Sequence, residues 1–109
     1  MPSCIFCRIV EKQAPADVLY EDDEIIVFKD INPKAPVHVL LVPKRHIATV
    51  NEVEERDVLL LGKLFTTAKT VAMQLSVAEK GYRLVVNVGR GGGQVIDHVH
   101  MHLLGGWQR

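Results

Sequence analysis

Apolar residues occur in short runs in the first part of the chain and again near its end, with turn-forming residues between the runs. Apolar runs bounded in this way are typical of strands. Ile25 to Phe28 is a continuous apolar run, and Pro33 and Pro36 mark a loop after it because proline lacks an amide donor. The expected strands cover residues 18–20, 24–30, 37–42, 82–88 and 98–104.

Two segments show helical spacing instead. Between Glu54 and Ala78, apolar residues recur at steps of three and four, which places them on one face of a long helix. These positions are Val58, Leu61, Phe65, Ala68, Ala72 and Leu75. Gly81 suits the left-handed residue that often ends a helix. A shorter helical turn is expected at residues 4–12.

The predicted elements run from strands to one long helix and back to strands. Short connections between the early strands favour antiparallel pairing. The sequence therefore predicts an α+β fold, with an antiparallel sheet of about five strands, one long helix and a short N-terminal helix. A chain of 109 residues has room for one core, so residues 1–109 are expected to form a single domain. The edges of so small a sheet favour dimerisation.

Charge limits the partners of this chain. Lys and Arg together number 13, and Asp and Glu together also number 13. This balance argues against a nucleic acid or an anionic membrane as the partner, but leaves a local site for a small anion open. No apolar run approaches the roughly 20 residues that span a bilayer. The N-terminus lacks the pattern of a secretory signal, so a cytoplasmic location is expected.

Three histidines alternate with apolar residues near the end of the chain. In a strand, His98, His100 and His102 would share one face and leave the other face to the core. Two kinds of chemistry fit such a face. The imidazoles could bind zinc, or one could attack a phosphorus atom while the others donate hydrogen bonds to phosphate oxygens.

The glycine-rich segment at residues 89–93 helps to choose between these two. Glycines allow main-chain N–H groups to converge on an anion, although such a segment alone could be a flexible turn. Next to three histidines, it favours phosphate chemistry. His38 and Asn87 are polar residues in apolar strands, so each should either find a partner or serve the site.

Cys4 and Cys7 have C-x-x-C spacing and could supply half of a zinc site, with His46 and His98 as candidates for the other half. Spacing alone leaves two alternatives open. The cysteines could be free, partly buried thiols, or they could form a redox pair.

The segment His-Val-His-Met-His-Leu-Leu at 98–104 resembles the motif of the histidine triad (HIT) superfamily. The segments 30–38, 92–94 and 105–106 are similar to those of its nucleotide-binding Hint branch. The resemblance implies a HIT-like fold that dimerises through a joined sheet. It also implies hydrolysis of purine nucleoside phosphoramidates and adenylates, with AMP or GMP as the nucleotide part.

The resemblance further implies individual roles. His100 would attack the α-phosphorus and form a nucleotidyl-histidine intermediate, with His38 and His102 as the other catalytic residues. The implied nucleotide contacts, besides His100 and His102, are Asp30, Ile31, Asn87, Gly93, Gln94 and Val95. The residues Cys4, Cys7, His46 and His98 match a structural zinc set of some members, and the chemistry itself would need no metal.

Three other functions stay open at this stage. A dinucleoside polyphosphate hydrolase belongs to a neighbouring branch, although the Gly105-Gly106 ending argues against it. A nucleotide-binding regulatory module would use the same pocket with incidental catalysis. A metallohydrolase would lose turnover when a chelator removes its metal.

Overall fold

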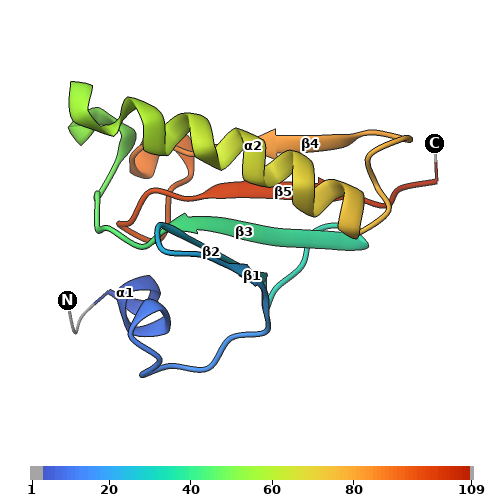
Figure 1. Cartoon of the computed structure of the whole chain (residues 1–109), viewed down its shortest axis with the longest axis horizontal. Coiled ribbons are helices and arrows are strands. Elements are labelled where there is room, and N and C mark those ends of the chain that lie inside the picture. The colour runs from blue at the N-terminus through green and yellow to red at the C-terminus, as the bar shows by residue number, and fades with distance from the viewer. Residues whose placement is uncertain (1–3, 109) are drawn as a thin grey trace.

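The computed structural model describes residues 4–108 as one antiparallel sheet with a helix on each face (Figure 1). Residues 1–3 and 109 of the expected domain lie outside the described residues. The α-helices and strands are α1 (Ile5–Val10), β1 (Val18–Glu21), β2 (Ile25–Lys29), β3 (Val37–Pro43), α2 (Val58–Gln74), β4 (Tyr82–Val85) and β5 (Met101–Gly105), and 3-10 turns lie at 50–52, 55–57 and 90–92. The predicted α+β class is confirmed. None of the described helices is long and apolar enough to cross a membrane.

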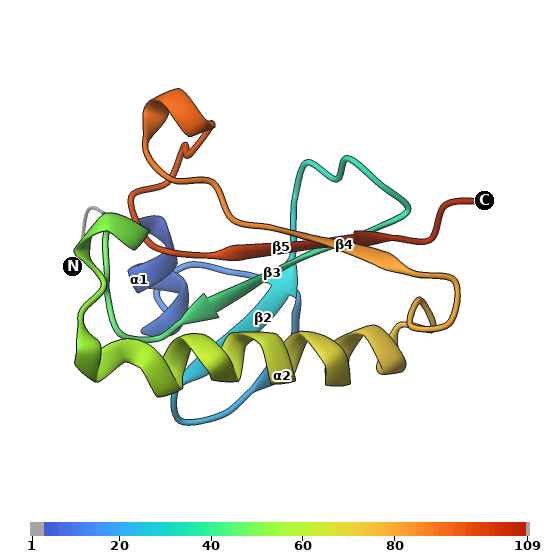
Figure 2. The ribbon, with the colours of Figure 1, turned by 90° about the horizontal axis from the view of Figure 1, so that it is seen from above.

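The strand order is β1-β2-β3-β5-β4, and every neighbouring pair is antiparallel. Residues directly opposite each other in an antiparallel pair point to the same face. Leu40 of β3 pairs with His102 of β5, and His38 pairs with Leu104, so both histidines lie on one face of the sheet. Figure 2 shows the segment between β4 and β5 looping away from the sheet before β5 begins.

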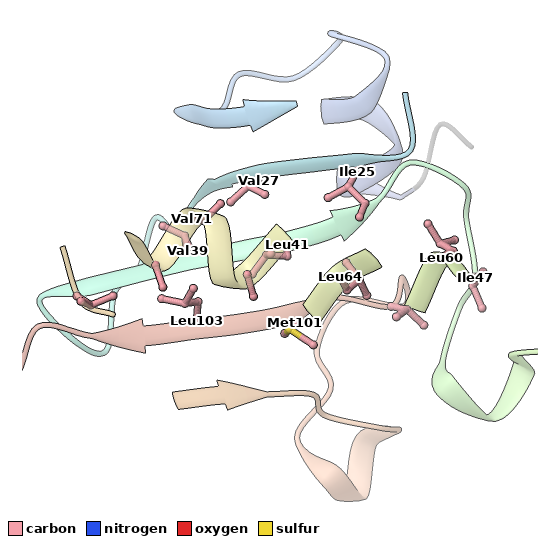
Figure 3. Close-up of a cluster of buried hydrophobic side chains, with 14 residues drawn as sticks. Ile25, Val27, Val39, Leu41, Ile47, Leu60, Leu64, Val71, Met101 and Leu103 are labelled. Atoms are coloured by element: carbon pink, nitrogen blue, oxygen red, sulfur yellow. The ribbon is translucent and has the colours of Figure 1, made fainter. Parts of the chain in front are cut away.

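Each face of the sheet has its own apolar core. On one face, Val27, Leu41 and Leu103 pack with Leu64 and Val71 of α2 (Figure 3). The other face carries a smaller cluster that includes Phe6 and Ile9 of α1 and residues of β2 and β3. Strands covered on both faces are mostly apolar, which explains the apolar runs at residues 25–28 in β2 and 39–43 in β3. We call the second face the α1 face.

The orientation of the long helix differs from the prediction. The residues of α2 that are buried are Leu60, Leu64, Thr67, Ala68, Val71 and Ala72. Val58 and Phe65, which the spacing places on the same face as Ala68 and Ala72, are 57% and 58% exposed, so the predicted apolar face is only partly the buried one. Because α2 is apolar on two faces, spacing alone does not reveal which of them meets the sheet.

The predicted cap at Gly81 is also wrong. The helix ends at Gln74, and Ser76 has the positive φ of 61° that ends a helix of this kind. The N–H of Val77 donates to the Ala72 carbonyl at 3.0 Å, which completes the cap. Gly81 also has a positive φ, but it lies in the turn that leads into β4.

Two strands are shorter than predicted because the chain between them leaves the sheet. β4 ends at Val85 instead of residue 88, and β5 begins at Met101 instead of residue 98. The N–H of Val99 donates to the carbonyl of Ile47 at 2.7 Å, outside the strand ladder. His98 therefore lies in a bend, and His100 lies in the segment that precedes β5.

Replacing Ser76 with glycine is expected to raise the free energy of unfolding by about 0.5–1 kcal/mol, because glycine adopts positive φ without a Cβ clash. Thr70→Gly, at an exposed position inside α2, is expected to lower it because glycine weakens a helix interior. Urea unfolding measures both changes. A destabilised Ser76→Gly protein would contradict the cap at Ser76.

Candidate functional site

Three histidines gather on the α1 face of the sheet. The ring of His102, on β5, lies 5.2 Å from that of His38, on β3, between centroids. The ring of His100 lies 5.0 Å from that of His102 between centroids. His98 turns instead toward Cys4 and Cys7. The structure therefore divides the predicted histidine run between two sites.

A main-chain hydrogen bond fixes the protonation of His100. Its Nδ1 atom lies 2.7 Å from the carbonyl oxygen of His98. A carbonyl only accepts, so Nδ1 carries the proton and the neutral ring keeps a lone pair on Nε2. Burial lowers the pKa of His100, which favours this neutral form. His100 thus has a nucleophilic nitrogen at Nε2.

A second main-chain contact decides which ring donates in the hydrogen bond between His38 and His102. The N–H of Lys34 donates to Nδ1 of His38 at 3.0 Å, so the proton of His38 is on Nε2. That N–H donates to Nδ1 of His102 at 2.9 Å. Burial lowers the pKa of both rings, that of His102 to about 4. His102 is therefore neutral and carries its proton on Nε2, where it can donate to an anion.

Asp30 completes this group at the end of β2. Its Oδ2 lies 3.4 Å from Nε2 of His38, and its Oδ1 accepts the N–H of Asn32 at 2.8 Å. The ligand atoms of Asp30, His38 and His102 lie within 4.8 Å of one another, as in a metal site. However, the Lys34 amide keeps the proton on Nε2 of His38, which leaves no lone pair there for a metal. We therefore assign this group to hydrogen bonding.

Cys4, Cys7, His46 and His98 form the second site, and both thiols are free. The Nδ1 atoms of His46 and His98 lie 3.2 Å apart. Cys7 Sγ lies 3.2 Å and 3.6 Å from these two atoms, and Cys4 Sγ lies 3.4 Å from the second. A tetrahedral zinc complex has edges of about 3.3 Å between nitrogens and about 3.6 Å between nitrogen and sulfur. The donor set therefore fits zinc.

His98 has the protonation that a metal ligand needs. Its Nε2 lies 2.7 Å from the carbonyl of Pro43, so Nε2 carries the proton and Nδ1 presents a lone pair toward the sulfurs. Burial lowers the pKa of His98 to about 4, and the side chain is fully buried. A ligand histidine held through its other nitrogen in this way is typical of metal sites.

The buried side chain of Gln94 holds the glycine-rich segment in place through hydrogen bonds. This side chain is 2% exposed, and its Oε1 accepts the N–H of Gly89 at 2.8 Å. Its Nε2 donates to the carbonyls of Ala48 at 2.8 Å and Ile96 at 2.9 Å. Asn87 donates to the Gly92 carbonyl at 2.8 Å. Gln94 and Asn87, both expected to bind nucleotide, thus use these side-chain groups to shape the loop.

The expected cradle of main-chain amides is largely absent from this loop. The N–H groups of Gly92 and Gln94 both donate to the carbonyl of Gly89, and that of Gly93 donates to Arg90. The N–H of Gly89 is held by the Gln94 side chain. These four amides are therefore committed within the loop and do not face an anion.

Ile31 and Val95 are exposed apolar residues among the predicted nucleotide contacts. Ile31 is 90% exposed directly after Asp30, and Val95 is 77% exposed directly after Gln94. Both apolar side chains are free to meet a ligand.

Sequence reasoning missed three residues that shape the site. The ring of Phe6 packs edge-on against His98 and His100, at 5.9 Å and 5.1 Å between centroids. Its place inside the C-x-x-C segment was the only available signal. Lys34 and Pro43 act through main-chain groups, which leave no signal in the identity of a side chain.

Gln94→Glu is expected to lower the free energy of unfolding by about 1–3 kcal/mol, because it sets a carboxylate oxygen against two carbonyls. The loss should be smaller at acidic pH, where the carboxyl group regains a donor. Asn87→Asp makes the same chemical change at a less buried position and should cost less. Urea unfolding at two pH values tests this, and equal stability of Gln94→Glu and the parent would contradict the assigned role.

The chain matches the family model described as HIT domain over residues 11–109. It is similar to the purine nucleoside phosphoramidase of Escherichia coli strain K12, with 46% identity over 102 residues. That match covers 94% of this chain and 86% of the relative.

Solved structures of HIT family proteins are also similar to this chain. The HIT family hydrolase from Legionella pneumophila Philadelphia 1 has a TM-score of 0.95 and 49% identity, covering 97% of this chain and 95% of the other. A Zn-bound histidine triad family protein from Mycobacterium smegmatis has a TM-score of 0.82 and 28% identity, covering 95% and 75%. The chain therefore belongs to the HIT domain family.

Proposed function

We propose that this protein hydrolyses purine nucleoside phosphoramidates and adenylates through attack of His100 on the α-phosphorus. The observation that carries the proposal is the 2.7 Å contact between Nδ1 of His100 and the His98 carbonyl, which leaves a lone pair on Nε2. The similarity to a purine nucleoside phosphoramidase supports the substrate class.

In the proposed reaction, Nε2 of His100 attacks phosphorus as the P–N bond to the amine breaks. The amine takes a proton from solvent and leaves, and the nucleotide stays bonded to Nε2. Water then attacks phosphorus, the P–Nε2 bond breaks, and one water proton goes to solvent. His102 donates from Nε2 to a phosphoryl oxygen and stabilises the charge that grows there. His38 holds His102 in the protonation state that donates.

The nucleotide, AMP or GMP in its bound form, would extend from these histidines toward Asp30 and the glycine-rich loop. We propose that the Asp30 carboxylate accepts hydrogen bonds from the ribose hydroxyls. The exposed side chain of Ile31 would contact the base. The remaining contacts would come from the loop, at Asn87, Gly93 and Val95, since the Gln94 amide is committed within the loop.

His100→Ala is expected to form no covalent adduct with adenosine phosphoramidate and still to bind AMP. His102→Asn keeps an acceptor for His38 but has no donor at the position of His102 Nε2. Adduct formation should therefore slow by roughly 10²–10³-fold. Rapid quenching at alkaline pH and intact mass spectrometry detect the adduct. Turnover by His100→Ala would refute the assignment of His100 as the nucleophile. AMP binding with no adduct in the parent protein would favour a regulatory binding module.

We further propose that the four-residue cluster Cys4, Cys7, His46 and His98 holds a structural zinc ion. The interatomic distances and the protonation of His98 fit this metal, and a related protein is described as Zn-bound. A bound zinc ion would supply cross-linking of α1 to the segments that carry the two histidines. The proposed reaction does not require it as a reactant.

A chelator is expected to lower the thermal midpoint of the parent protein, because metal binding to the folded state adds to its stability. Cys4→Ser should bind less zinc and melt at a lower temperature, with little further change on chelation. Metal analysis and thermal melts measure these effects. A parent protein that contains zinc but melts at the same temperature after chelation would contradict a structural role.

We also propose that residues 1–109 form one domain and that two copies associate through α2 and β4. The outer face of α2 exposes Val58, Leu59, Phe65 and Met73 by 57–87%. β4 is an edge strand, so the sheet can continue into a second copy. We propose a cytoplasmic location as well, because neither of the described cysteines forms a disulfide.

Phe65→Glu is expected to convert the dimer to a monomer, because it places a charge in the centre of the apolar face of α2. Val18→Glu makes a similar change on β1, at the opposite edge of the sheet, and should leave the dimer intact. Analytical ultracentrifugation distinguishes the two. A parent protein that is monomeric at high concentration would contradict the proposal.

A further inference from the structure

Helix α1 carries two of the four cluster residues, Cys4 as its N-cap and Cys7 within it, and Phe6 lies between them. The Phe6 side chain is 5% exposed. Its ring meets that of His100 at 5.1 Å between centroids and at an interplanar angle of 87°. It also contacts the rings of Phe28 at 5.5 Å and His98 at 5.9 Å. Phe6 thus forms a wall against the proposed nucleophile.

The metal cluster and the nucleophile also share a residue. His98 points Nδ1 toward the sulfurs of Cys4 and Cys7, and its carbonyl accepts the Nδ1 proton of His100. A shift of His98 would therefore move the acceptor that orients His100.

The position of α1 depends on contacts outside the helix. It has six residues, fewer than an isolated helix needs to be stable in water. Its buried side chains are Phe6, Cys7 and Ile9. Of these, Phe6 and Ile9 supply the apolar packing, and Cys7 Sγ lies 3.2 Å from Nδ1 of His46 and 3.6 Å from Nδ1 of His98. A metal at this cluster would replace these weak sulfur hydrogen bonds with stronger metal–ligand bonds. Metal binding should therefore determine how firmly Phe6 is held.

We propose that Phe6 is a positioning residue for His100, and that a metal ion at Cys4, Cys7, His46 and His98 keeps α1 and Phe6 against that ring. The proposal rests on the proposed function, since it concerns the alignment of the same nucleophile. Phe6 prevents the ring from turning away from the His98 carbonyl, so Nε2 stays aimed at phosphorus. Small misplacements of a reacting group cost large factors in rate.

Phe6→Leu in the zinc-loaded protein tests this directly, because leucine keeps the apolar packing but lacks the flat ring. The variant should bind zinc as the parent does, with kcat for adenosine phosphoramidate lower by roughly tenfold and KM little changed. The ¹H NMR signal of the His100 Nδ1 proton should broaden. Ile9→Val is the matched control, because Ile9 is buried in the same cluster, and it should keep both kcat and that signal.

Chelation of the parent protein provides a second test that requires no variant and no turnover. It should broaden the same His100 signal, and added zinc should restore it. The inference is overturned if Phe6→Leu matches the parent in kcat and in this signal, or if chelation leaves the signal unchanged. A parent protein that does not turn over would refute the proposed function alone, because the NMR measurements would still test the role of Phe6.

Discussion

The chemistry of this site depends on a hydrogen bond from Nδ1 of His100 to the carbonyl of His98. This bond decides which nitrogen carries the proton and so which nitrogen can attack. The Pro43 carbonyl does the same for His98, and the Lys34 amide does the same for His38. Main-chain groups therefore give similar imidazoles different protonation states: His100 keeps a lone pair on Nε2, His98 keeps one on Nδ1, and His38 donates from Nε2 to His102.

The fold supplies these main-chain groups from distant parts of the chain. β3 carries His38 near its start and Pro43 at its end, and the segment before β5 carries His98 and His100. Gln94 fixes the loop that brings this segment back to the sheet. Helix α1 then closes the face of the sheet that holds the histidines, so the cluster of Cys4, Cys7, His46 and His98 becomes a neighbour of His100.

Much of this arrangement could be predicted from the sequence. The alternating histidines, the apolar runs and the cysteine spacing led to the α+β fold and to the residues that the structure brings together. The orientation of α2 could not be predicted, because Phe65 and Leu64 are equally apolar and only packing selects Leu64 for the core. The helix cap at Ser76 was missed because glycine is the usual residue at positive φ.

The site departs from the prediction where a side chain has more than one use. Gln94 was expected to bind a ligand, but burial commits its amide to the loop. The sequence around Phe6 does not indicate a contact with His100, because the two residues meet only when α1 packs on the sheet. The protonation of each histidine depends on carbonyls and amides that every residue type provides, so only the three-dimensional structure reveals it.

The most direct measurement is the pair of ring ¹⁵N chemical shifts of His100 in the ligand-free protein at neutral pH. They distinguish a nitrogen that carries a proton from one that carries a lone pair. The account predicts a neutral ring with its proton on Nδ1 and an unprotonated Nε2. A ring protonated on Nε2, or on both nitrogens, would contradict it.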